Sequence, residues 1–179
     1  MASRKLIDLI PSARLAANST IKRCKAVGVD LLIYCTKRTL EEQAILYRQS
    51  RLTADIVEKA RQLDLLGYDF LAEILISVGP QPGKVGAHVT KATPGQSWHN
   101  FGMAFDAVPL DARGRALWAT SNREWGVYGR CAEACGLNWG GSWRSFKDCP
   151  HSQLTHGPNP MNQYTPSIMK NILIEYGIL

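Results

Sequence analysis

Two short polar segments constrain the fold of this chain more than any other feature. Residues 97–106 (SWHNFGMAFD) contain one histidine and one aspartate, and residues 148–151 (DCPH) contain another of each. Two imidazoles and one carboxylate form a ligand set with which catalytic zinc keeps its fourth position open. Because the segments lie far apart in the sequence, only a folded domain can bring His99, Asp106 and His151 together. A local zinc knuckle, whose ligands come in close pairs, is therefore disfavoured.

The size of the chain predicts one domain. With 179 residues and 45% hydrophobic content, it can bury one ordinary core and has too little left for a second domain of usual size. We expect a single domain over residues 1–179, with its core at about 29–155. The net charge of +6 favours a polyanionic neighbour such as a cell-wall polymer, although an ordinary basic surface explains it equally well. No basic helix or aromatic and basic platform suggests nucleic acid as a partner.

Cysteine usage and the start of the chain predict a cytoplasmic origin. The five cysteines are odd in number and contain no CxxC pair, which suits a reducing compartment. Asp8 and Pro11 interrupt the first apolar run, so it lacks the core of a signal peptide. No apolar run approaches the length needed to cross a bilayer. We expect the protein to stay inside the cell until something else releases it.

Periodicity and stop signals predict helices alternating with short strands. The apolar positions predicted to be buried are Leu15, Ala16, Cys24 and Val27 in the first helix and Ile168, Ile172, Leu173 and Tyr176 in the last. Thr39 and Glu42 form a capping box, and turns are expected at 79–84 and Pro94–Gly95. The first predicted helix starts at Pro11 and ends at Gly28, and the others cover 40–51, 54–66, 68–78, 122–135 and 166–176. The predicted strands cover 29–35 and 102–109.

Asp106 is an acid in a largely apolar strand. Alternation places Ala104, Asp106 and Val108 on one face and Met103, Phe105 and Ala107 on the other. A buried carboxylate is costly without a cation or a hydrogen-bond partner, and a metal would provide one. The alternative is an aspartate at a strand end that faces solvent or pairs with Arg113 or Arg115.

Two further residues suit hydrolysis. Asp148 precedes the last histidine by three positions, and a carboxylate beside a cation is ionised and can take a proton from water. Arg38 lies at a strand-to-helix junction, where its fork of donors could hold an oxyanion or a substrate carboxylate. An arginine at such a junction is also commonly a surface charge. The remaining histidines, His88 and His156, are interpreted as structural, and the Cys131 and Cys135 pair as core.

Together these motifs resemble a known family. Ser97-x-His99-x-x-Gly102-x-Ala104-x-Asp106, Trp139-Gly140-Gly141-x-Trp143 and Asp148-x-x-His151 are similar to the metallopeptidases that include the D-alanyl-D-alanine peptidases of vancomycin resistance and the L-alanyl-D-glutamate endopeptidases of bacteriophage lysis. Residues 93–102, and Lys37-Arg38-Thr39 before Gln43 and Tyr47, resemble the endopeptidase branch. The resemblance spans about 30–155, with an interruption at 53–82.

The resemblance implies a fold and a set of residue roles. The fold is α+β, a small antiparallel sheet flanked by helices of the hedgehog/DD-peptidase type, here with a helical insertion at about 53–78 and a C-terminal helix at about 166–176 docked on the core. One zinc ion per chain is implied on His99, Asp106 and His151, and several relatives have Glu at the position of Asp148. The implied roles are general base for Asp148, substrate orientation or oxyanion stabilisation for Arg38, and substrate binding for Ser97, Trp139 and Trp143.

These expectations converge on a monomeric zinc peptidase that acts on the peptidoglycan stem peptide. The predicted function is that of an endolysin that cuts the L-alanyl-D-glutamate bond, accumulates in the host cytoplasm and reaches the wall through a separate membrane pore. One alternative is a D-alanyl-D-alanine carboxypeptidase with the same metal site. Another is a non-catalytic protein that contains zinc and binds the cell wall.

Overall fold

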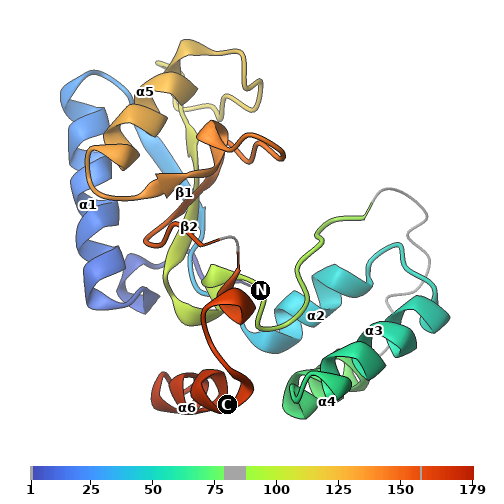
Figure 1. The fold of residues 1–179 in the computed structure, drawn as a ribbon. Coiled ribbons are helices and arrows are strands. Elements are labelled where there is room, and N and C mark those ends of the chain that lie inside the picture. The colour runs from blue at the N-terminus through green and yellow to red at the C-terminus, as the bar shows by residue number, and fades with distance from the viewer. Residues whose placement is uncertain (1, 79–87, 158) are drawn as a thin grey trace. The chain divides into compact units, whose positions relative to one another are not determined.

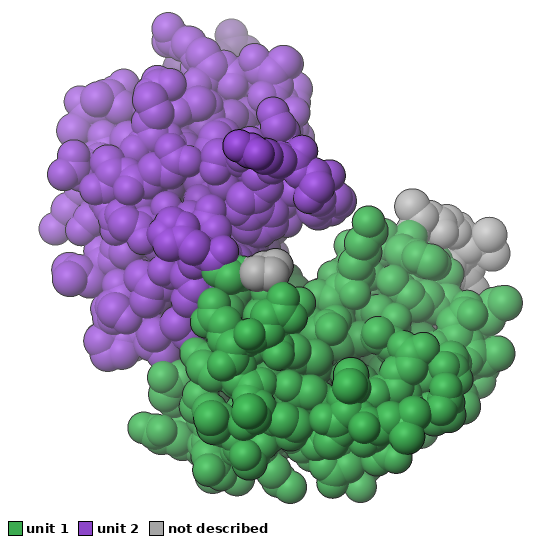
Figure 2. Space-filling view, viewed as in Figure 1, with its two compact units in different colours: residues 1, 38–100, 157–179 green, residues 2–37, 101–156 purple. Residues whose placement is uncertain are grey.

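A computed structural model describes residues 2–78, 88–157 and 159–179. Within it the chain forms two compact units, each built from separate parts of the sequence (Figure 2). Unit 1 contains residues 38–100 and 157–179, and unit 2 contains residues 2–37 and 101–156. The organisation of residues 1–179 as a single domain therefore stays a prediction.

The described residues form the elements labelled in Figure 1. Short 3-10 turns, among them η2 (Trp98–Phe101), η3 (Gly140–Ser142) and η4 (Pro160–Asn162), join some of them. The strands are β1 (Leu31–Cys35), β2 (Ala104–Pro109), β3 (Asn138–Trp139) and β4 (His151–Gln153). The helices are α1 (Pro11–Ala26), α2 (Leu40–Arg48), α3 (Thr53–Leu65), α4 (Asp69–Ser77), α5 (Arg123–Glu133) and α6 (Pro166–Glu175).

Unit 2 is built on an antiparallel sheet with the strand order β1-β2-β4-β3. Helices α1 and α5 lie beside this sheet (Figure 1), and side chains from both join Phe105 and Ala107 of β2 in one buried core. The largest of them, Trp125 and Tyr128, come from α5 and are almost fully buried. The predicted α+β class with a small antiparallel sheet and flanking helices is confirmed.

Helix α1 packs through small residues. Its buried positions are Ala13, Ala16, Ala17, Thr20 and Cys24. The prediction was right for Ala16 and Cys24 but wrong for Leu15 and Val27, which are 70% and 63% exposed. A helix that packs through alanines can approach the sheet closely, and its longer apolar side chains are then left on the outer side.

Unit 1 contains helices at the positions predicted for the insertion. α3 packs against α4, and α4 packs against α2. Helix α6 buries Met169 and Leu173, whereas Ile168 and Tyr176, which were also predicted to be buried, are exposed. The predicted turn at Pro94–Gly95 is present. Gly95 has φ +78°, and a Cβ there would lie 2.5 Å from Leu71 Cδ1, so the turn requires glycine.

Two local predictions concern helix ends. The capping box of α2 is confirmed, because Thr39 Oγ1 accepts from Glu42 N and Glu42 Oε2 accepts from Thr39 N. Asn122 occupies the N-cap position of α5, but its side chain donates to Ala119 O instead of accepting a bond from the helix. The predicted connection at 79–84 lies outside the described residues. Among the described helices, none has the length and apolar character needed to span a bilayer.

Candidate metal centre

Three side chains with metal-binding atoms form a row across the sheet of unit 2. Asp106 of β2 pairs with Cys35 of β1 on one side and with His151 of β4 on the other. Directly opposed residues of antiparallel strands project on the same face. Phe105 and Ala107, which flank Asp106, enter the core with α1 and α5, so the row lies on the other face of the sheet.

A β-bulge in β1 brings Cys35 into this row. Leu31, Leu32 and Ile33 pair with Pro109, Val108 and Ala107 in one register, but Cys35 then pairs with Asp106 because the register shifts between Ile33 and Cys35. Without the extra residue, Tyr34 would oppose Asp106. Instead, the Tyr34 ring packs edge-on against Trp118 with centroids 5.5 Å apart. Bulges re-aim side chains in this way, often beside functional sites.

Asp106 has a histidine partner. Its Oδ1 lies 3.2 Å from His151 Nδ1, and both residues are buried. The alternative partners, Arg113 and Arg115, instead use their main-chain N–H groups to contact the Asp111 carboxylate, which the Arg115 guanidinium also binds. Asp106 is therefore a buried aspartate beside His151 and not a solvent-facing one.

Gln153 determines which nitrogen of the His151 ring faces Asp106. Gln153 Nε2 donates to Thr155 O at 2.7 Å, so its Oε1 faces His151 Nε2 at 3.0 Å. An amide oxygen only accepts, and the proton of the neutral ring is therefore on Nε2. Nδ1 then carries the lone pair on the side of Asp106. A metal-binding histidine commonly has its other ring nitrogen held by such an acceptor.

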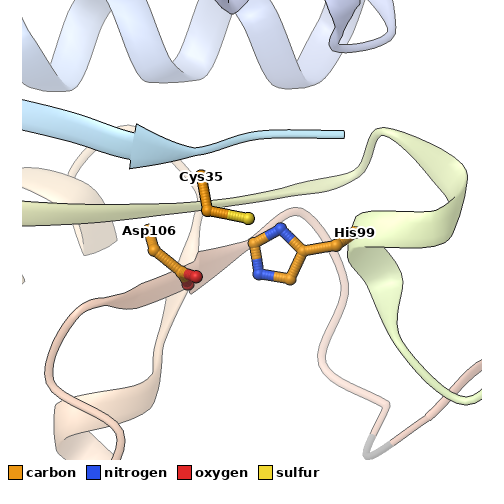
Figure 3. A group of neighbouring side chains, drawn as sticks. All are labelled: Cys35, His99 and Asp106. Atoms are coloured by element: carbon orange, nitrogen blue, oxygen red, sulfur yellow. The ribbon is translucent and has the colours of Figure 1, made fainter. Parts of the chain in front are cut away.

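His99 brings a second imidazole to the row. One ligand atom from each of Cys35, His99 and Asp106 lies within 4.8 Å of the other two, and all three residues are buried. Figure 3 shows the Cys35 sulfur and the Asp106 carboxylate pointing toward the imidazole ring of His99. Asp106, a member of this group, also contacts His151.

The turn that carries His99 is held by a buried amide. Asn100 Nδ2 donates to the carbonyls of Arg38 and Thr39, and its Oδ1 accepts from Gly95 N. Asn100 is fully buried. In addition, Arg38 N donates to His99 O at 3.1 Å. The segment that follows β1 is thereby tied directly to the turn η2.

Arg38 and Ser97 lie beside this turn. Arg38 Nη1 donates to Gln43 Oε1 at 2.8 Å, and Gln43 Nε2 donates in turn to Ala92 O. The guanidinium is therefore oriented by a buried side chain of α2 and does not behave as an ordinary surface charge. Ser97 is half-buried and accepts through its main-chain oxygen from Asn100 N. The roles of Arg38 and Ser97 toward a substrate stay predictions.

Asp148 approaches the sheet at a glycine. Its N–H donates to Gly140 O, and its carbonyl accepts from His151 N. A Cβ on Gly140 would lie 2.4 Å from Asp148 O, so only glycine lets the Asp148 turn come this close. This close approach explains why the tryptophan-glycine motif has glycine at position 140.

The two tryptophans of that motif have different surroundings. The Trp143 ring lies beside the His151 ring with centroids 5.4 Å apart, and its Nε1 donates to Asn138. Trp139 packs against the core of unit 2, and its Nε1 donates to Cys149 O. Their predicted substrate contacts stay predictions, and Trp143 is the one placed next to a predicted ligand.

A tyrosine supports β4 from the core. Tyr128 Oη lies 2.7 Å from Ser152 Oγ, and it donates to Pro150 O at 3.1 Å. Burial raises the pKa of Tyr128 well above its usual range, and the Asp106 carboxylate adds to the shift. The phenol is therefore neutral and acts as a hydrogen-bonding group behind the row.

From the sequence, the remaining histidines are interpreted as structural, and the Cys131 and Cys135 pair as core. His88 and His156 are exposed, and Cys131 packs against the core of unit 2. Burial, followed by a hydrogen bond from Cys131, raises the pKa of Cys24 to about 12. Among the described residues, neither Cys131 nor Cys135 belongs to a group of three side chains that could hold a metal.

The donor set fits zinc. Imidazole nitrogen, carboxylate oxygen and thiol sulfur are its usual ligands in proteins, whereas magnesium and calcium prefer oxygen alone. The residues of this site that sequence reasoning missed are Cys35, Asn100 and Gln153. Gln153 carried a weak signal, because residues two apart on a strand share a face. Cys35 carried none, because its place depends on the bulge.

The chain is similar to characterised peptidases. Residues 90–154 match the model of a family described as D-alanyl-D-alanine carboxypeptidase. Over 154 residues the chain is 26% identical to the peptidoglycan L-alanyl-D-glutamate endopeptidase CwlK of Bacillus subtilis (strain 168). This match covers 82% of the chain and 74% of the relative.

Two solved structures also match at low identity. The L-Ala D-Glu endopeptidase ChiX of Serratia marcescens is 17% identical with a TM-score of 0.46, and the match covers 87% of this chain and 89% of ChiX. A mutant of the vancomycin-resistance D,D-pentapeptidase VanY in complex with Zn(II) is 16% identical with a TM-score of 0.47. That match covers 94% of this chain and 83% of VanY.

Proposed function

We propose that this chain, whose residues 90–154 match the model of a family described as D-alanyl-D-alanine carboxypeptidase, is a zinc-dependent peptidoglycan peptidase that cuts the L-alanyl-D-glutamate bond. The observation that carries the proposal is the contact between Asp106 Oδ1 and His151 Nδ1 at 3.2 Å, with His151 Nε2 held by Gln153. The choice of bond is supported by the endopeptidase activity in the name of the relative CwlK.

We assign the metal to His99, Asp106 and His151. A bound zinc ion would supply Lewis-acid polarisation of the scissile carbonyl and a lowered pKa of water. Gln153 keeps the His151 lone pair on the side of Asp106, so these two residues are oriented to bind the same ion. One ion per chain is expected, because Asp106 belongs both to the group with Cys35 and His99 and to the contact with His151.

The protein groups around the ligands provide the remaining chemistry. Asp148, whose main chain is bonded to Gly140 and His151, is proposed as the base that takes a proton from water and returns it to the leaving amine. Arg38, oriented by Gln43, is suited to hold the developing negative charge or a substrate carboxylate. Ser97 and Trp143 are proposed to contact the stem peptide.

We further propose that the enzyme acts in lysis, as a phage-type endolysin that accumulates in the host cytoplasm. The five free cysteines suit a reducing compartment. A net charge of +6 would keep the enzyme near anionic wall polymers after release through a separate pore. A monomer is sufficient, because every proposed site residue comes from one chain.

Digestion of purified muropeptides tests the bond specificity. We expect a released peptide whose new amino terminus is D-glutamate, identified by mass spectrometry, and no such product from His151→Ala. Loss of a single terminal D-alanine would instead support the carboxypeptidase activity that the description of the matching family favours. A protein that binds zinc and wall but releases nothing would support the non-catalytic alternative.

A further inference from the structure

The row across the sheet contains a donor that the proposed ligand set does not use. Cys35 is 3% exposed and stands directly opposite Asp106 in the β1-β2 ladder. Its sulfur belongs to the group with His99 and Asp106 in which all ligand atoms lie within 4.8 Å. A buried thiol among an imidazole and a carboxylate is a strong potential zinc donor, because thiolate is one of the ligands zinc prefers.

We propose that Cys35 is a fourth protein ligand of the metal, so that the resting site is bound by sulfur, two nitrogens and one oxygen. The inference rests on the ligands assigned above and adds one that they do not include. When the sulfur binds, the thiol proton passes to solvent and nothing is oxidised.

Distances favour this arrangement. With zinc bond lengths of about 2.0–2.3 Å, the donors of a tetrahedral site lie about 3.3–3.6 Å apart. Asp106 Oδ1 and His151 Nδ1 are already 3.2 Å apart. The sulfur lies within 4.8 Å of ligand atoms of His99 and Asp106, and side-chain rotation can bring these donors closer together.

The bulge gives the sulfur its orientation. Continuing the register of Leu31 to Ile33 would place Tyr34 opposite Asp106 and turn Cys35 to the other face. Figure 3 shows the sulfur pointing toward the His99 ring. A cysteine needed only for packing has no requirement for this irregularity, whereas a ligand has to face the other donors.

A fourth protein ligand has consequences for activity. Structural zinc sites are closed by four protein ligands, whereas catalytic sites keep one position open. Cys35 would thus hold the ion tightly and compete with water for the same position. We expect Cys35→Ser to bind zinc about tenfold more weakly or worse, because the variant loses one of the four ligands.

Cobalt substitution tests the proposal without relying on activity. Purified full-length protein loaded with Co²⁺ should show the intense near-ultraviolet absorption of a bond from cysteine sulfur to cobalt. Cys35→Ser should lose this absorption, and Cys149→Ser, a matched variant two residues from His151, should keep it. A wild type without the absorption, or a Cys35→Ser protein that retains it, would overturn the proposal.

A second measurement needs no variant and covers the case in which Cys35→Ser does not fold. X-ray absorption of the zinc-loaded wild type should show one sulfur at about 2.3 Å. A shell of nitrogen and oxygen alone would contradict the proposal even if the protein cleaves muropeptides. Conversely, a sulfur ligand in a protein that releases no peptide would contradict the proposed peptidase function and leave this inference standing.

Discussion

On the sheet, Asp106 and His151 are placed by strand register, whereas His99 and Arg38 lie in loops and are placed by main-chain bonds and a buried amide. The ladder sets Asp106 and His151 side by side through three consecutive residue pairs of β2 and β4. The loop residues depend on Asn100, which binds Gly95, Arg38 and Thr39. A regular ladder fixes side-chain faces automatically, and an irregular segment needs a dedicated polar residue to do so.

The largest effects should separate binding from catalysis on the sheet side. His151→Ala removes a ligand and should lose both zinc and activity. Asp148→Ala should keep zinc but lose about 10²–10⁴-fold in activity, because a base and not a ligand is removed. Turbidity loss of a cell-wall suspension, recorded with the zinc content of each protein, measures both. An Asp148→Ala enzyme with near wild-type activity would refute the assignment of the base.

A smaller effect should show how the ladder is assisted by Gln153. Gln153→Met keeps the length of the side chain but removes the acceptor for His151 Nε2. Zinc affinity should fall by about 10–100-fold, measured by competition with a chelating dye. Gln153→Glu retains an oxygen at this place and should recover part of the affinity.

Comparing the zinc affinities of the two variants shows whether Gln153 orients the His151 ring or only fills space. If Gln153 acts only by filling space, the two variants should bind zinc equally well and differ only in urea unfolding of the metal-free protein. Unchanged zinc affinity in Gln153→Met would show that the His151 ring is held by the ladder alone.

The smallest effect concerns the loop side. Asn100→Ala leaves Gly95 N and the carbonyls of Arg38 and Thr39 without this buried partner, so unfolding should become easier by about 1–3 kcal/mol. Asn122→Ala is the matched control, because it removes one solvent-exposed bond to Ala119 O and should change stability by about 0.5 kcal/mol or less. Urea denaturation of both variants measures the difference. Equal midpoints would mean that main-chain bonds alone hold the loops.

Sequence reasoning succeeded where local rules decide the structure. The capping box of Thr39 and Glu42 and the turn at Gly95 depend on residues close in the sequence, and both are present. It failed on the faces of α1 and α6, because the buried side of a helix depends on the shape of its neighbour. Leu15 is exposed and Met169 is buried for that reason.

The sequence by itself determined the chemical inventory of the site: two histidines, two aspartates and an arginine in motifs that resemble one family. The pairing of Asp106 with His151, the acceptor that Gln153 offers, and the place of Cys35 were decided only by the tertiary structure. The physical reason is register. A register shift of one residue in β1 places Cys35 opposite Asp106. No pattern in residues 31–35 predicts that shift, because it arises only when β1 pairs with β2.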